Sequence, residues 1–301
     1  MKKRIFKNDT GEASLTIYHI FTGIEVVYAS VHMDYFDVYQ ANKEGNYIEI
    51  HHCLEGRMEY TFENAFFYLT AGDMAIAIRK QVVEGYHFPL RHYHGVMIAI
   101  DMDKAPECFC SFMDDVNVLP LHVAQRFCKH YPFATIRGEK YVEHIFSEFY
   151  TISEEQKLGY LKIKVLELFY VLSQMDVSKY CENERFVPKN QVVLAKEMEN
   201  YLIQNLEKRI TVLELAKQFH VSESYLKNLF KSVYGMPVSS YIRVLKMQSA
   251  SYQLIHTNQT ISVIASEVGY SNESKFSSAF KSVMGETPSQ FRKTHSQVRI
   301  V

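Results

Sequence analysis

The hydrophobic pattern of this chain changes about one third of the way along it. Between residues 15 and 101, short runs rich in β-branched and aromatic residues alternate with pairs of turn-forming residues, a pattern that predicts strands. The expected strands are Leu15–Phe21, Ile24–His32, Tyr47–Leu54, Met58–Tyr68, Met74–Ile78 and Val96–Ile100. The expected turns are at Gly23, Gly45-Asn46, Glu55-Gly56, Gly72-Asp73 and Gly95. Many short strands at this spacing are typical of a small barrel or sandwich.

After about residue 121 the apolar residues recur with the period of a helix. Helices are expected over Glu139–Ile152 and Glu155–Met175. The second helix carries an apolar stripe made by Leu161, Val165, Leu168 and Leu172. This stripe either covers the sheet or forms a dimer contact, and the sequence favours neither.

A polar segment, Asp176–Asn190, contains Pro188 and separates this part from a region that is helical to the end. A chain of 301 residues is long for a single core. We therefore expect a multi-domain α+β protein. Its parts are a β domain over residues 1–121, a helical packing or dimerisation segment over 122–176, a linker over 177–190 and an all-α domain over 191–301.

Charge is distributed unevenly between the two halves. The net charge of the chain is -1, but residues 189–301 hold 14 Lys and Arg against 8 Asp and Glu, or +6, which leaves -7 for residues 1–188. An acidic half joined to a basic half indicates that only the second half meets a polyanion.

The basic half contains an internal repeat. TVLELAKQFHVS from Thr211 aligns with TISVIASEVGYS from Thr260 at an offset of 49 residues. After one inserted residue, LFKSVYGMP and AFKSVMGETP align at an offset of 50, with five identities in the seven residues from Phe230 to Met236. So close a match predicts two copies of one structural unit.

Each copy has the residue order of a helix-turn-helix, over about residues 211–233 and 260–284. Thr211 and Glu214 form the T-x-x-E pattern of a capping box. A short turn follows, through His220 in one copy and Gly269 in the other. Ser222 and Ser271 are then expected to cap the second helix of each unit.

In each second helix the apolar residues face the core and leave a polar outer face. Leu226, Leu229, Phe230 and Val233 have the spacing of a buried stripe, as do Phe276, Ala279, Phe280 and Val283. A short polar face can enter a major groove and bond to base edges, although either face alone fits a merely solvated helix. The predicted DNA-binding residues are Ser222, Ser224, Lys227, Asn228, Lys231, Ser274, Lys275, Ser277, Ser278 and Lys281.

Residues 188–295 resemble the DNA-binding domain of the AraC/XylS family. The resemblance rests on a leading helix (Val192–Leu206), the two units, a connecting helix (Val238–His256) and a closing G-x-T-P-S-x-[FY]-R at Gly285–Arg292. It implies that the two recognition helices enter successive major-groove segments roughly one DNA turn apart. Two positions depart from the family pattern. Ser278 stands where a base-reading Arg is frequent, and His220 stands where Gly is frequent.

The same resemblance implies a cupin-like β-barrel in the first half, which binds a small-molecule effector or dimerises. IEIHHCLEGRMEY and FFYLTAGDMAIAI are similar to the two hairpins of such a barrel. The candidate effector-binding residues are His51, Tyr60, His92 and His94. Strand alternation sends His51 and His52 to opposite faces, so one of them could join His92 and His94 in a three-His metal site. The chain lacks the spaced H-x-H followed by a suitably placed Glu that metal cupins have, and no metal or cofactor is expected.

The sequence thus predicts a sequence-specific transcriptional regulator with no catalytic residues. Its expected partners are double-stranded DNA, an effector, a second copy of itself and RNA polymerase, and activation is the commoner role in the family. The alternative is a metal-dependent cupin enzyme with a helical partner-binding module. No secretory or membrane segment is evident, so a cytoplasmic location is expected. The five cysteines are odd in number and scattered, which fits a reducing compartment better than a disulfide framework. Cys108 and Cys110 are expected to be ordinary thiols.

Overall fold

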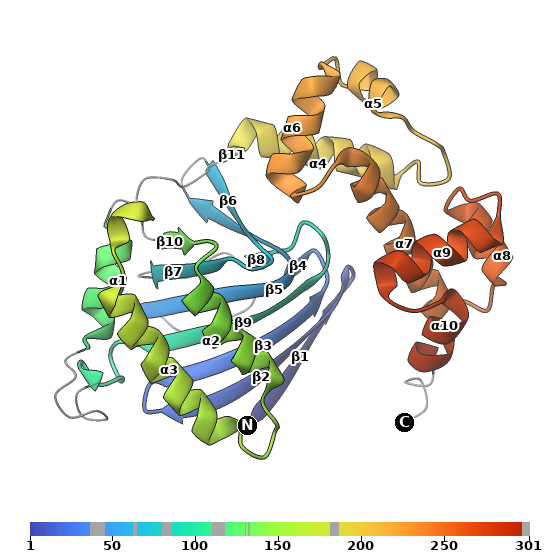
Figure 1. Cartoon of the computed structure of the whole chain (residues 1–301). Coiled ribbons are helices and arrows are strands. Elements are labelled where there is room, and N and C mark those ends of the chain that lie inside the picture. The colour runs from blue at the N-terminus through green and yellow to red at the C-terminus, as the bar shows by residue number, and fades with distance from the viewer. Residues whose placement is uncertain are drawn as a thin grey trace. The chain divides into compact units, whose positions relative to one another are not determined.

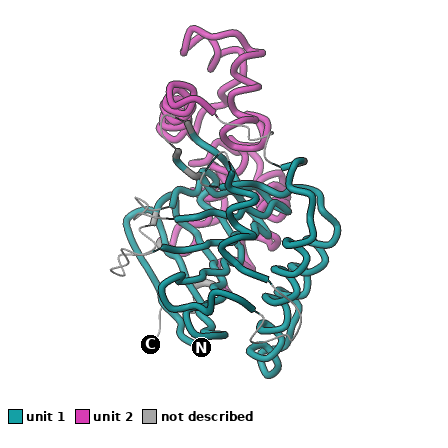
Figure 2. Tube along the Cα trace, turned by 90° about the vertical axis from the view of Figure 1, so that its left-hand side faces the viewer, with its two compact units in different colours: residues 1–186 teal, residues 187–301 magenta. Residues whose placement is uncertain are grey.

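The computed structural model describes residues 1–36, 46–62, 65–79, 86–109, 118–129, 131, 133–180 and 187–296. The chain divides into two compact units, Met1–Phe186 and Val187–Val301, coloured separately in Figure 2. Each unit has its own architecture.

The first unit is built on a large antiparallel sheet. Its strands are β1 (Lys2–Asn8), β2 (Gly11–Phe21), β3 (Ile24–His32), β4 (Tyr35–Phe36), β5 (Tyr47–Phe62), β6 (Ala65–Thr70), β7 (Met74–Arg79), β8 (Tyr86–His87), β9 (Tyr93–Asp101) and β10 (Phe133–Ile136). The main strand order is β1-β2-β3-β9-β5-β6, with β7 between β5 and β10, and β8 beside β4 and β5. This confirms a mixed helix-and-sheet protein. Among the described strands no pairing closes the sheet into the expected barrel.

A single strand, β5, stands where two strands, Tyr47–Leu54 and the start of Met58–Tyr68, and a turn between them were expected. The turn expected at Glu55-Gly56 is wrong, because β5 runs through it from Tyr47 to Phe62. Here the register against β9 shifts between Cys53 and Glu55, which is a β-bulge. Gly56 has φ +86°, and a Cβ there would lie 1.9 Å from the carbonyl oxygen of His92. Glycine therefore serves to bend a strand against its neighbour, not to reverse the chain.

Gly95 is also part of a strand. It lies inside β9 opposite Cys53, and a Cβ there would come within 2.5 Å of the His52 carbonyl oxygen. The expected turn at this position is therefore wrong, since close approach of two strands explains the glycine. The turns at Gly23 (φ +69°) and Gly72 (φ +84°) are confirmed, whereas Gly45 lies outside the described residues.

Helices cover one face of the sheet (Figure 1). These are α1 (Pro120–Phe127), α2 (Lys140–Thr151) and α3 (Lys157–Gln174). The predicted stripe of α3, Leu161, Val165, Leu168 and Leu172, is fully buried in one apolar cluster with β-strand residues such as Ile98. The stripe therefore covers the sheet. The opposite face of α3 exposes Ile163 and Tyr170.

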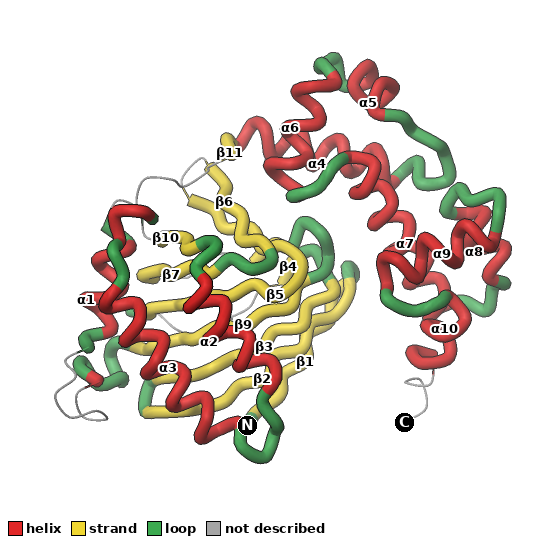
Figure 3. The backbone as a smooth tube through the Cα atoms, in the orientation of Figure 1, coloured by secondary structure: helices red, strands yellow, loops and turns green. Residues whose placement is uncertain are grey.

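The second unit is helical apart from a short β11 (Val187–Pro188), as Figure 3 shows. Its helices are α4 (Lys189–Ile203), α5 (Val212–Gln218), α6 (Glu223–Tyr234), α7 (Val238–His256), α8 (Ile261–Glu267), α9 (Glu273–Met284) and α10 (Pro288–Ser296). Helix α7 has the bounds predicted for the connecting helix. Of the expected linker, residues 177–179 form a short 3-10 helix and residues 181–186 lie outside the described ranges.

The described helices and cysteines test two further expectations from the sequence. None of the described helices combines the length with the apolar character that a bilayer-crossing segment needs. Cys53 and Cys128 are not disulfide-bonded, as expected, but Cys108 is. The expectation of ordinary thiols is therefore wrong for Cys108, because the structure brings a second sulfur within bonding distance.

Candidate nucleic-acid interface

The first helix-turn-helix consists of α5 and α6, and side chains cap both helices as predicted. The Thr211 N–H donates to Glu214 Oε2 (2.8 Å), and the Glu214 N–H donates to Thr211 Oγ1 (3.2 Å). The Tyr225 N–H donates to Ser222 Oγ at 3.1 Å. These bonds satisfy N–H groups that a helix start leaves unpaired, and so fix where each helix begins.

The second helix-turn-helix consists of α8 and α9, and its cap differs from the prediction. Asn272, not Ser271, caps α9, since its Oδ1 accepts the Lys275 N–H at 2.9 Å. Ser222 and Asn272 are 50 residues apart, so the inserted residue of the second copy lies in the turn, before the cap. Ser271 is consequently wrong as a cap, because the insertion shifts it out of the capping position.

Both turns pass through a left-handed backbone conformation. His220 has φ +55° and Gly269, its equivalent, has φ +78°. A non-glycine residue pays a steric cost here. At Gly269 a Cβ would lie 2.6 Å from the Glu207 carbonyl oxygen and 2.7 Å from Lys246 Nζ. The second turn therefore needs glycine for space as well as for its φ angle.

Burial orients the two recognition helices as predicted. In α6 the residues Leu226, Leu229, Phe230 and Val233 are buried. In α9 Phe276 and Phe280 are buried at 0% exposure, while Ala279 and Val283 pack partly buried against the same cluster. The opposite face of each helix therefore points away from the core.

The structure exposes nearly all the predicted DNA-binding residues. Those exposed are Ser222, Ser224, Lys227, Asn228, Lys231, Ser274, Lys275, Ser278 and Lys281. Ser277 is half-buried beside Phe276. Both faces are thus available to a partner, and the α6 face holds the larger hydrogen-bonding groups.

Two residues at the start of α6, Glu223 and Tyr225, belong to this exposed face but were not predicted from the sequence. The Glu223 carboxylate lies 3.4 Å from Lys227 Nζ, so the α6 face carries an acid that partly offsets its lysine. Tyr225 is 39% exposed in the same turn. It occupies the position that Lys275 has in the second helix-turn-helix, 50 residues later. Applying the repeat offset to every predicted residue would have identified it.

Arg292 of the closing motif bonds to the end of α7 and to the segment that follows it. The Arg292 guanidinium donates to the Gln259 carbonyl oxygen at 2.6 Å through Nη2, and to the Leu254 carbonyl oxygen at 3.3 Å through Nε. Both carbonyls lie at or just beyond the end of α7, where a helix leaves carbonyl groups unpaired. Arg292 thereby fixes the entry of the chain into α8.

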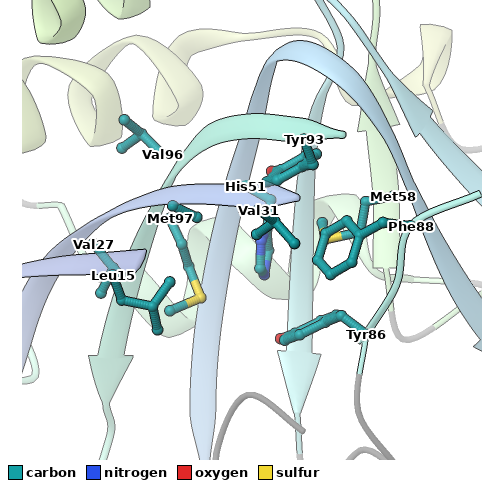
Figure 4. A pocket seen from close by; sticks show the side chains of 11 residues that line it. Leu15, Val27, Val31, His51, Met58, Tyr86, Phe88, Tyr93, Val96 and Met97 are labelled. Atoms are coloured by element: carbon teal, nitrogen blue, oxygen red, sulfur yellow. The ribbon is translucent and has the colours of Figure 1, made fainter. Parts of the chain in front are cut away.

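In the first unit His51 lies in a small cavity against Tyr86, Met58 and Phe88 (Figure 4). We name it the His51 cavity; its volume is about 30 Å³, room for about two water molecules. Beside it Glu49 is buried, with Oε1 2.6 Å from Arg79 Nη1 and Oε2 3.0 Å from the Tyr86 hydroxyl. Burial would raise the pKa of this carboxyl, but its contacts with His51, Arg79 and Tyr86 outweigh burial and lower it.

His52 points to the opposite face of the sheet, as strand alternation predicted. Its ring stacks on Phe146 of α2 with centroids 4.3 Å apart, and Nδ1 lies 2.9 Å from the Tyr150 hydroxyl. Burial lowers the pKa of His52 to about 4, so the ring is neutral at neutral pH. This histidine belongs to the contact between sheet and helices.

Of the candidate effector residues whose side chains are described, His92 and His94 lie together, with ring centroids 4.7 Å apart, and His51 lies apart from them. His94 lines a second cavity of about 350 Å³ together with Ser30, Glu55 and Tyr150, which we name the His94 cavity. His51 lines the other cavity, so a three-His site that includes His51 is wrong. Because side chains alternate between the two faces along a strand, His51 and His94 lie on opposite sides of the sheet. Burial first, and then His92, lower the pKa of His94; the side chain of Tyr60 lies outside the described residues.

Comparisons with known proteins match the helical unit. Residues 215–294 match the family described as a helix-turn-helix domain. The Msm operon regulatory protein of Streptococcus mutans is 34% identical over 28% of this chain and 30% of its own length. The HTH-type transcriptional regulator YtdP of Bacillus subtilis is 24% identical over 68% of this chain and 28% of its own length.

Among solved structures, the C-terminal domain of AraT, a response regulator from Geobacillus stearothermophilus, is 29% identical. It covers 34% of this chain and 84% of its own, with a TM-score of 0.33. The chain spans between 28% and 51% of the length of the first five curated relatives that it matches.

Proposed function

Because residues 215–294 form a helix-turn-helix domain of the AraC type, we propose that this chain is a sequence-specific DNA-binding transcriptional regulator. The observation that supports this proposal most strongly is the pair of exposed polar helix faces on α6 and α9, which an internal repeat places in one basic unit. Binding to double-stranded DNA is supported by these comparisons, and the enzyme alternative is not. Activation, rather than repression, is the proposed role.

The two faces divide the work of recognition unequally. Asn228 can bond two atoms of an adenine edge, and Lys227 can bond a guanine edge. The corresponding residues of α9 are Ser277 and Ser278, whose hydroxyls are shorter and whose bonds are single. We therefore assign base recognition mainly to α6, and positioning against phosphates to Lys231, Lys281 and α9.

The first unit supplies control in this proposal. The His51 cavity, at about 30 Å³, is too small for a metabolite in the described arrangement. An effector there would select an arrangement in which the cavity is larger. The exposed Ile163 and Tyr170, on one face of α3, offer an apolar surface for a second copy of the chain. A homodimer, contact with RNA polymerase and a cytoplasmic location complete the proposal.

The phosphate assignment is tested by salt dependence. Lys231→Ala or Lys281→Ala in the full-length chain should weaken binding to all duplex sequences alike, because a phosphate contact carries no base information. The slope of log K against log salt concentration should become shallower by about one. Binding isotherms at four or five salt concentrations measure it.

Lys140→Ala is the matched control, since it removes an exposed lysine from the first unit. Its slope should equal that of the parent chain. Unchanged slopes in both Lys231→Ala and Lys281→Ala would show that these lysines do not reach phosphate.

A further inference from the structure

Three histidines converge at one end of the sheet in the first unit. The nitrogen atoms that His32, His92 and His94 offer all lie within 4.8 Å of one another. Their ring centroids are 5.3 Å apart for His32 and His92, 5.2 Å for His32 and His94, and 4.7 Å for His92 and His94. In the described part of the chain, no other group of three His, Cys, Asp or Glu side chains is as close.

Strand pairing places these three side chains together. His94 lies opposite Ser30 in the antiparallel β3–β9 pair, and His32 ends β3 two residues further on. His92 directly precedes β9, and the close approach of Gly56 to its carbonyl group holds its backbone. Two of the three histidines therefore lie on paired strands, and the third lies directly beside one of them.

A carboxylate orients one member of the cluster. Glu55 Oε2 lies 3.1 Å from His92 Nε2, which leaves Nδ1 of His92 as the nitrogen for a ligand. Metal-binding histidines regularly bond a carboxylate through their second nitrogen, and this bond fixes the ring and raises its basicity. Two half-buried rings and one exposed ring also leave access from solvent.

We propose that His32, His92 and His94 bind a divalent transition-metal ion of the zinc class, with Glu55 as the orienting carboxylate. Imidazole nitrogen suits Zn²⁺, and three protein ligands leave a fourth position of the tetrahedron open. Zn–N bonds of about 2.0–2.1 Å place ligand nitrogens about 3.3 Å apart. Rotation of the side chains, of which His32 is exposed, closes the remaining distance.

The open coordination position of the ion would lie next to the His94 cavity. His94 and Glu55 also line the His94 cavity of about 350 Å³, whose wall carries the hydroxyl groups of Ser14, Thr16 and Ser30. A bound ion would therefore lie beside a polar cavity large enough for a small oxygen-rich molecule. This metal site is independent of DNA binding, and its test requires no DNA.

The test is metal titration of the purified full-length chain after removal of metal by EDTA and dialysis. Calorimetry with Zn²⁺ alone should show one saturable site per chain, and Co²⁺ should give the visible absorption of tetrahedral coordination. His94→Ala should lower the affinity about 100-fold or more, and Glu55→Gln about 10- to 100-fold. His32→Ala, at an exposed position, repeats the test where folding is least disturbed.

His19→Ala is the matched control, because His19 is exposed and its Nδ1 lies 3.0 Å from Glu25 Oε1, outside the cluster. It should bind as the parent chain does. Absence of saturable binding by the folded parent chain would overturn the proposal. So would equal losses in His94→Ala, His32→Ala and His19→Ala.

Discussion

Replacing Asn228 by alanine should abolish most of the discrimination for adenine at one position of the DNA target. The expected loss is about 1–3 kcal/mol, or about 5- to 150-fold, because a bidentate contact to one base edge disappears. Asn228 is exposed on α6 between Ser224 and Lys231, and it is uncharged. Its removal therefore leaves the electrostatic part of the affinity in place.

The measurement is affinity for a panel of duplexes that differ from the preferred site by one base pair. Ser278→Ala is the matched control at the equivalent position of α9, and it should change the preference little. Lys227→Ala is less clean, since it also frees Glu223, now 3.4 Å from Lys227, to repel phosphate. If Asn228→Ala kept the full preference of the parent chain, α6 would not be the base-reading helix.

Replacing Gly269 by alanine should destabilise the second unit by about 2–5 kcal/mol. The left-handed φ of +78° costs a non-glycine residue about 1–2 kcal/mol. The added Cβ would also lie 2.6 Å from the Glu207 carbonyl oxygen and 2.7 Å from Lys246 Nζ. An overlap with backbone costs a further 1–3 kcal/mol or so. Chemical denaturation followed by helical circular dichroism gives the free energy of unfolding.

Gly285→Ala separates the two causes. Gly285 has φ +82°, but a Cβ there would meet nothing within 4 Å. It should therefore cost only the conformational part, about 1–2 kcal/mol. Equal destabilisation by both substitutions would mean that the turn yields, and that the contact with Glu207 does not constrain it.

The second unit was predictable from sequence because its determinants are local. The capping box of Thr211, the cap at Ser222 and the buried stripe of α6 each depend on residues within two helical turns. The repeat then predicted the same features 49 or 50 residues later. It failed at Ser271, since an alignment cannot say where in a turn an extra residue is inserted.

The first unit was less predictable because its determinants are non-local. Glycines at 56 and 95 look like turn residues in sequence, yet each is required by a strand distant in the chain. His32 gave no signal of its own, and only the β3–β9 register brings it to His92 and His94. A single sequence records strand alternation, which placed His51 and His52 correctly, but it does not record which strands pair.

Selection of duplexes from random DNA by the full-length chain shows whether this protein recognises a specific sequence. We expect enrichment of one sequence containing two conserved segments, centred roughly one helical turn apart. The sharper of the two should lose its preference in Asn228→Ala. Retention of DNA at low salt without enrichment of any sequence would contradict a sequence-specific regulator.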